Sequence, residues 1–385
     1  MNTSPPAYDL APLFAVAAVG LALAIGPLAW FWLRRRHAAP SARVRAFAVL
    51  VLFLSFDLVL LGAFTRLSDS GLGCPDWPGC YGHASPSGAS EHIARAEAAV
   101  PTGAVTHAKA WIEMAHRYSA TAIGVLVIAL MVFVIAEVRR RRVVAVSPGW
   151  AIATLLWVVA QGAFGALTVT MRLYPAIVTL HLLGGLGLLA LLAIQAEVYE
   201  PRRLALAPPL RRGLAAVTAL ALVQIALGGW VSTNYAVLAC SEFPACQGSW
   251  WPDMDFASAF QLLRPLGLDA AGTYLPFSAL TAIHVAHRIG AFIVLPAILV
   301  LAWRMVVGGG REARPWAWAL AGIAAWQTAS GLGNVLLGWP LVAAVAHTAG
   351  SAALVVVLTI LLVRARPMPF VDASRWPAGR ERLAS

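Results

Sequence analysis

The sequence predicts an all-α integral membrane protein, built from two tandem-duplicated four-helix bundles with one extra transmembrane helix at the N-terminus. Three observations lead to this prediction. The first is the composition of the 385 residues, 60% hydrophobic and 12% charged, which lies outside the range of water-soluble domains. The second is a series of apolar stretches long enough to cross a hydrocarbon layer of roughly 30 Å as helices. The third is a repeat at a constant offset of 166 residues, which indicates a duplicated unit.

Nine apolar stretches are expected to span the membrane. They are rich in Ala, Leu, Val and Gly and lack the alternation of outer-membrane strands, so helices are expected. The first has no basic region before it and arginines after it, which favours an uncleaved transmembrane helix over a signal peptide. The stretches run over residues 10–33, 45–65, 115–136, 150–170, 176–198, 214–234, 279–303, 316–337 and 341–363.

The repeat copies polar residues as well as apolar ones. At an offset of 166, Cys74, Cys80, Gln161, Gly165 and His181 recur as Cys240, Cys246, Gln327, Gly331 and His347. Ala115-His116-Arg117 recurs as Ala286-His287-Arg288 at an offset of 171. We therefore expect four parts: the extra helix and linker over 1–42, the first four-helix repeat over 43–205, the second over 206–370, and a tail over 371–385.

The basic residues set the expected orientation. Alternate loops and the C-terminal segment hold 21 of the 28 Lys and Arg, which places them in the cytoplasm. The N-terminus and two long loops, at about 66–112 and 235–278, are then outside. This topology and anionic lipid account for the net charge of +11, so no nucleic-acid partner is expected.

All four cysteines fall in these two outer loops, as Cys74 with Cys80 and Cys240 with Cys246. An even number at equal spacing in an oxidising compartment favours one local disulfide in each loop. A four-cysteine zinc site is the alternative, although the close Cys-x-x-Cys pairs typical of such sites are missing. The disulfides could staple the loops or exchange with a redox partner.

Four histidines, His116, His181, His287 and His347, begin helices that run inward from the outer surface. A single histidine there is more often an interface residue, but four at one depth, two in each repeat, favour function. Two imidazoles facing each other across a four-helix bundle suit the axial positions of a haem. Zinc or copper also accepts imidazole, but a third ligand at this depth is missing.

The residue one helical turn before His116 differs from the residue one turn before His287. Glu113 lies one turn before His116, whereas His284 lies one turn before His287. This asymmetry suggests chemistry in the first repeat and electron transfer in the second; the alternative is that Glu113 only faces outer water. Arg117 and Arg288 follow the ligands and are candidates for pairing with haem propionates or with lipid head groups.

With these motifs the chain resembles the haem A synthases of bacteria and mitochondria. The resemblance covers about residues 45–365. The matching motifs are Gly62 to Leu72, Cys74 to Cys80, the Glu113-x-x-His116-Arg117 box, Gln161 to Gly165 with His181-Leu182, His287-Arg288, and Gln327 to Asn334 with His347. The extra first helix and an insertion near 84–106 depart from the family pattern.

The resemblance implies a haem b at His287 and His347 and the substrate haem O at His116 and His181. It also implies that the C8 methyl group of haem O is oxidised to a formyl group through a hydroxymethyl stage, with Glu113 as the catalytic carboxylate. Arg66, inside the first motif, joins Arg117 and Arg288 as a candidate for holding propionates.

The expected location is a bacterial cytoplasmic membrane. The expected partners are haem O and haem A, lipid, a haem O synthase, an electron acceptor and a second copy of the chain. Two other functions stay open: a two-haem electron-transfer cytochrome without substrate chemistry, and a transporter with duplicated halves.

Overall fold

The computed structural model describes residues 11–140 and 147–365. The predicted tail over 371–385, with its arginines, lies outside the described residues. The described residues form helices and loops, with β structure only as isolated bridges.

Nine long helices correspond to the nine predicted stretches. They are α1 (Ala11–Arg35), α2 (Pro40–Leu67), α4 (His107–Arg139), α5 (Gly149–Thr170), α6 (Pro175–Tyr199), α7 (Pro208–Thr233), α9 (Phe277–Gly308), α10 (Gly310–Leu336) and α11 (Leu341–Arg364). Three short helices lie in the long loops: α3 (Ser90–Ala99), η1 (Ala236–Ala239) and α8 (Phe256–Ala259). The start of α4 at His107 is earlier than the predicted residue 115, because the Thr106 hydroxyl accepts a hydrogen bond from Lys109 N at 3.2 Å and caps the helix.

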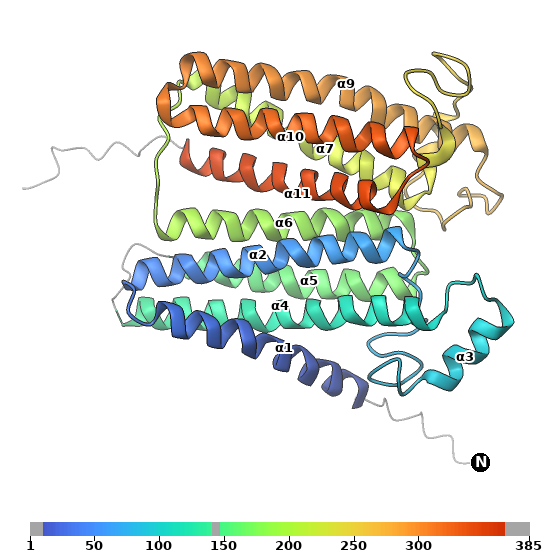
Figure 1. Ribbon diagram of the computed structural model, residues 1–385, viewed down its shortest axis with the longest axis horizontal. Coiled ribbons are helices and arrows are strands. Elements are labelled where there is room, and N and C mark those ends of the chain that lie inside the picture. Colours follow the sequence, from blue (N-terminus) through green and yellow to red (C-terminus); the bar gives the residue numbers. More distant parts are fainter. Residues whose placement is uncertain (1–10, 141–146, 366–385) are drawn as a thin grey trace, which may run out of the picture.

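Eight of these helices are long and apolar enough to cross a membrane by themselves. The exception among the described helices is α10: its charged residues Arg311, Glu312 and Arg314 lie in its first five positions, and the uncharged remainder contains Trp, Gln, Ser, Asn and Gly residues that lower its mean hydropathy. It nevertheless packs along α9 and α11 for most of its length (Figure 1). The protein is therefore a multi-pass, all-α membrane protein, and a ninth span at α10 depends on its packing rather than on its composition.

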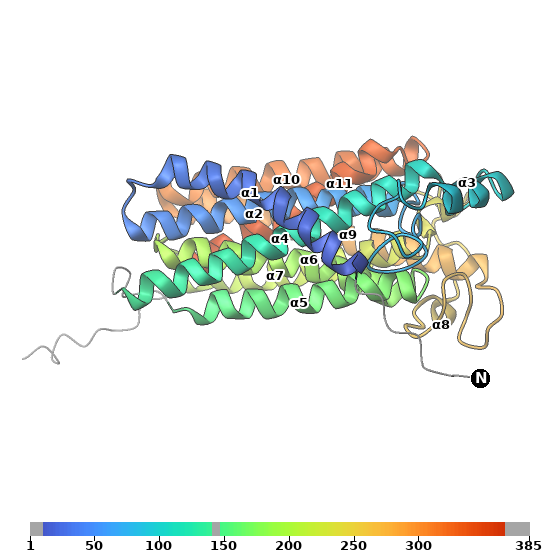
Figure 2. The same cartoon turned by 90° about the horizontal axis from the view of Figure 1, so that it is seen from below.

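The long helices form two groups of four, and α1 packs as a fifth helix against the first group. The first core is formed by α2, α4, α5 and α6, and α1 adds Ala24 and Phe31 to its outer side; the second core is formed by α7, α9, α10 and α11. Figure 1 shows the two groups side by side, and Figure 2, seen from below, shows α1 crossing α4 on the side of the first group away from the second. A methyl group on Gly20 of α1 would lie 2.5 Å from Thr121 Cγ2, so only glycine permits this close approach. The boundaries at 42, 205 and 370 stay a prediction.

The two groups meet through α6 and α11, and two contacts join residues 166 positions apart. Arg66 Nη2 donates to the Ser232 carbonyl at 2.7 Å, and the Tyr235 hydroxyl donates to Asp69 Oδ1 at 2.6 Å. Burial raises the pKa of Tyr235, which keeps its hydroxyl a donor. A residue that contacts its own repeat equivalent lies close to a pseudo-two-fold axis.

At the opposite end, Arg364 binds the buried carboxylate of Glu197 with two hydrogen bonds of 2.7 and 2.9 Å. The two groups are therefore joined by polar contacts at both ends of the bundle. We call the end that carries the loops Cys74–Cys80 and Cys240–Cys246 the cysteine end.

Candidate paired-histidine sites

The four candidate histidines lie at one depth below the cysteine end. His181 and His347 each follow the first residue of their helices, Pro175 and Leu341, by six positions. Each of the four imidazoles lies against a glycine of a neighbouring helix, and each glycine lies five residues before the end of its helix. The pairs are Gly62 with His116, Gly165 with His181, Gly228 with His287, and Gly331 with His347.

These glycines leave space for the rings. A methyl group on Gly62 would come within 2.9 Å of His116 Cε1, and one on Gly228 within 3.0 Å of His287 Cε1. The corresponding distances are 3.4 Å at Gly165 and 3.3 Å at Gly331. At the first two positions a larger residue would displace the imidazole, so the glycines help to fix where the rings stand.

His287 on α9 and His347 on α11 face each other. Their ring centres are 6.5 Å apart, and the ring planes make an angle of 82°. Two metal–nitrogen bonds of roughly 2 Å, with about 1 Å from each nitrogen to its ring centre, add to about 6 Å. The spacing therefore leaves room for one metal ion between the two rings.

Hydrogen bonds to Nδ1 differ between the two pairs. In the second group, Ser330 Oγ lies 2.9 Å from His347 Nδ1, and Gln224 Nε2 lies 3.0 Å from His287 Nδ1. In the first group, Nδ1 of His116 and of His181 is buried without a hydrogen-bond partner among the described residues. The side chains of His116 and His181 are each half-buried, and Nδ1 belongs to the buried part of both.

Arg117, directly after His116, binds the first cysteine loop. Its guanidinium donates to the carbonyls of Asp76 at 2.8 Å, Gly79 at 2.5 Å, Pro78 at 3.2 Å and Cys74 at 3.3 Å. These contacts join the start of α4 to the loop above it.

Arg288 does the same in the second group. It donates to the carbonyls of Glu242 at 2.8 Å, Ala245 at 3.0 Å and Cys240 at 3.3 Å. Because Arg66, Arg117 and Arg288 all have protein partners, their binding of propionates stays a prediction.

Glu113 is buried, with 3% of its surface exposed, so the alternative in which it only faces outer water is wrong. Its Oε1 accepts from Arg117 Nη2 at 2.5 Å, and its Oε2 accepts from Cys74 N at 2.7 Å. His284, at the same place in the second group, is also 3% exposed, and its Nδ1 lies 3.0 Å from the Ala236 carbonyl. Both residues join a helix that carries a candidate histidine to the loop segment above it, but only Glu113 brings a charge.

Cys74 pairs with Cys80 and Cys240 with Cys246, each with a Cα–Cα distance of 4.8 Å. The predicted pairing within each loop is confirmed. No cysteine thiol is left to bind zinc. Among residues 11–140 and 147–365, no cluster of three or more His, Cys, Asp or Glu could hold a metal ion, so the histidines offer pairs of ligands only.

The comparison with protein families agrees with this arrangement. The COX15-CtaA family, described as cytochrome oxidase assembly protein, matches residues 45–359. A haem A synthase of Shewanella oneidensis is 36% identical over 316 residues, which cover 81% of this chain and 93% of that protein. The chain belongs to the haem A synthase family.

More distant haem A synthases match with similar coverage. That of Caulobacter vibrioides is 28% identical over 357 residues, covering 85% of this chain and 97% of the relative. That of Halalkalibacterium halodurans is 26% identical over 303 residues, covering 75% and 86%. The family places the chain in haem A biosynthesis. Paired imidazoles without a third ligand fit a haem, whose porphyrin supplies the other four iron ligands, better than a bare metal ion.

Two polar residues that lie beside the imidazoles, Gln224 and Ser330, were not predicted from the sequence. Their repeat equivalents, 166 positions earlier, are Leu58 and Phe164. Aligning the two repeats and listing the positions near the histidines where a polar residue faces an apolar equivalent would identify both Gln224 and Ser330.

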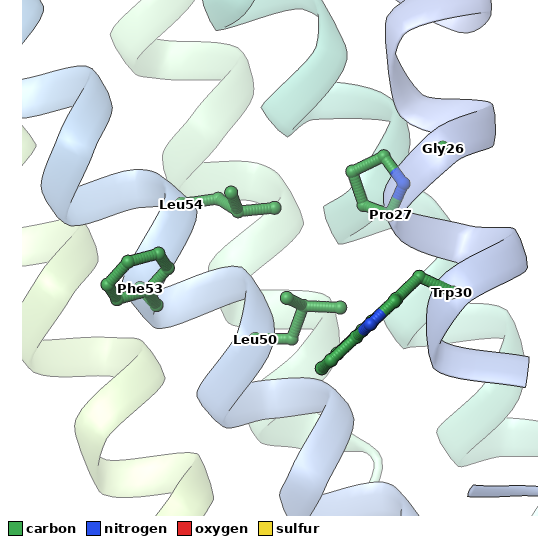
Figure 3. A pocket seen from close by; sticks show the side chains of 6 residues that line it. All are labelled: Gly26, Pro27, Trp30, Leu50, Phe53 and Leu54. Atoms are coloured by element: carbon green, nitrogen blue, oxygen red, sulfur yellow. The ribbon is translucent and has the colours of Figure 1, made fainter. Parts of the chain in front are cut away.

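An apolar hollow between α1 and α2 is a weaker candidate for a site. It is lined by Gly26, Pro27, Trp30, Leu50, Phe53 and Leu54, none of which has an ionisable side chain (Figure 3). The paired histidines are therefore the part of the described chain best suited to chemistry.

Proposed function

We propose that this chain is a haem A synthase that oxidises the C8 methyl group of haem O to a formyl group through a hydroxymethyl stage. The observation that carries the proposal is the duplicated histidine pair, with His287 and His347 at a spacing that leaves room for one metal ion between the two rings. Membership of the family supports haem A biosynthesis, and the two pairs support one haem in each half.

We assign a resident haem b to His287 and His347. When bound, this group supplies one-electron transfer. The chain's own contribution is to hold the two rings in fixed positions, through Gly228 and Gly331 on one side and through Gln224 and Ser330 at Nδ1. Such fixed ligands suit a cofactor that stays in place.

We assign the substrate haem O to His116 and His181. Its farnesyl tail stays in the apolar phase while the two imidazoles fix the plane of the ring, so that one methyl group is presented to the protein. Positioning of this kind supplies much of the rate enhancement. The Nδ1 atoms without partners suit a ligand pair that must also release its product.

Glu113 is our candidate for the catalytic carboxylate. Each oxidation stage removes electrons and protons, and a carboxylate near the methyl group can accept a proton or stabilise positive charge on the carbon. Arg117 and Cys74 N hold its two oxygen atoms in place. His284 at the equivalent position lacks a negative charge, which argues against a symmetric two-haem relay.

We further propose that the protein lies in a bacterial cytoplasmic membrane with its cysteine end outside. A haem O synthase, an electron acceptor and a second copy of the chain are the proposed partners. The orientation is supported by the distribution of arginines, and the synthase and the electron acceptor are required by the proposed reaction.

The proposal is tested by extracting haems from the purified protein after expression with and without a source of haem O. We expect haem A or its hydroxymethyl precursor only when haem O is present. Haem b alone under both conditions would favour the electron-transfer cytochrome.

A further inference from the structure

We infer that Ser330 and Gln224 are positioning residues for the haem of the second half, and that they set its reduction potential and retention through Nδ1 of His347 and His287. The inference rests on the proposed function, because it takes these two histidines as ligands. Neither residue is repeated in the first half, and neither is one of the proposed haem ligands.

Ser330 gives the clearer contact. Its hydroxyl donates to the Trp326 carbonyl one turn earlier on α10, at 2.7 Å, and its oxygen lies 2.9 Å from His347 Nδ1. Because the single hydroxyl proton is used at Trp326, the Ser330 oxygen accepts the proton of Nδ1. This fixes the tautomer of His347 so that its Nε2 keeps a lone pair for iron.

Gln224 contacts the other ligand. Its Nε2 lies 3.0 Å from both Nδ1 and the carbonyl of His287, while its Oε1 is buried without a partner among the described residues. Because Nε2 donates to the His287 carbonyl, the Gln224 oxygen can accept the proton of an iron-bound imidazole at Nδ1 only if the amide both turns over and moves away from that carbonyl. Both ligands of this pair therefore have a polar side chain at the far nitrogen.

The first half provides an internal comparison. Leu58 and Phe164 replace Gln224 and Ser330, and neither can form a hydrogen bond through its side chain. The result is visible at the rings, since Nδ1 of His116 and of His181 is buried and unpartnered within the described chain. The duplication thus kept four imidazoles but left hydrogen bonds at only one pair.

This difference has a chemical consequence. A hydrogen bond from Nδ1 to an acceptor makes the imidazole a stronger donor to the metal and holds the ring in its orientation. Stronger donation favours ferric over ferrous iron, which lowers the reduction potential. Removal of the acceptor should therefore raise the potential and weaken haem binding.

The test uses the purified full-length holoprotein and two measurements, a redox titration of its low-spin haem b and the rate of haem loss to an excess of apomyoglobin. For Ser330→Ala we expect a potential higher by about 59 mV, which corresponds to a tenfold shift in the ferric-to-ferrous preference. We expect haem to be lost roughly 10- to 100-fold faster. Gln224→Leu, which introduces the residue found at position 58, should shift both quantities in the same direction.

Two variants separate this role from helix stability. Thr328→Ala removes a hydroxyl of α10 that bonds only the Ala324 carbonyl at 2.9 Å, and it should leave the potential unchanged. Ser330→Thr retains the hydroxyl and should keep the potential and haem loss of the unmodified protein. The inference is overturned if Ser330→Ala behaves like Thr328→Ala, or if Ser330→Thr shifts the potential as far as Ser330→Ala does.

His347→Ala distinguishes this inference from the proposed function. Loss of the low-spin haem b signal in His347→Ala, together with an unshifted Ser330→Ala, would refute only the role of Ser330. Persistence of that signal in His347→Ala would instead refute the ligand assignment on which the inference rests.

Discussion

Replacement of Arg117 by glutamine tests the contacts that hold α4 to the first cysteine loop, Cys74–Cys80. Arg117 and Glu113 form an ion pair with N–O distance 2.5 Å, and their side chains are only 9% and 4% exposed. Removal of the guanidinium leaves a buried carboxylate with Cys74 N as its remaining hydrogen-bond donor. Breaking a buried pair in this way costs about 3 to 5 kcal/mol.

Arg288→Gln is the matched control in the second half. Arg288 binds a comparable set of loop carbonyls, but His284 replaces Glu113, so no carboxylate is stranded. Loss of charged hydrogen bonds to neutral carbonyls is expected to cost about 1 to 3 kcal/mol. Because both variants lose their contacts with loop carbonyls, Arg117→Gln should be the more destabilising by the cost of the unpaired carboxylate, about 3 to 5 kcal/mol.

The assay is denaturant unfolding of the two purified variants in the same detergent, followed by tryptophan fluorescence, with limited proteolysis of each cysteine loop as a local probe. We expect Arg117→Gln to lower the free energy of unfolding more and to expose the first loop. Equal losses in the two variants would refute the reasoning that the buried Glu113 charge distinguishes the halves.

Three further predictions concern the two sites. Glu113→Gln should retain haem b and bind haem O, while product formation, measured by chromatography of extracted haems at equal protein amount, falls at least roughly a hundredfold; near-normal output would make Glu113 a purely structural residue. Gly62→Val should displace the imidazole beside it and abolish haem O binding, whereas Gly228→Val should remove the resident haem b, as optical spectra can show; loss of the same haem from both variants would contradict the separate sites. Replacing Cys74 by serine should lower the free energy of unfolding by about 2 kcal/mol, which denaturant titration can check, and an unchanged stability would show that the loop disulfide is no staple.

The sequence predicted the helices, the local disulfides and the common depth of the histidines, because each follows from nearby residues. Apolar length defines a span, a separation of six residues favours a bridge within one loop, and helix direction places His181 and His347 near the same end. The start of α4 was not predicted from the apolar pattern, because the cap at Thr106 extends the helix beyond its apolar part.

The surroundings of the site could not be predicted in the same way. The contact of Glu113 with Cys74 N joins residues 39 positions apart, and it depends on how the loop folds back over α4. Ser330 and Gln224 were hidden for a different reason: a repeat is recognised by residues that match, and these two are where the halves differ. The glycines next to the histidines were visible as repeated residues, but their contact with the rings required the packing of neighbouring helices.

The division of the two haems between the halves is tested most directly by the optical and haem-content analysis of His181→Ala and His347→Ala, purified in parallel. We expect His347→Ala to lose the low-spin haem b signal but still to bind added haem O. We expect His181→Ala to retain haem b and to fail to bind haem O. Loss of the haem b signal from His181→Ala, with its retention in His347→Ala, would contradict the account.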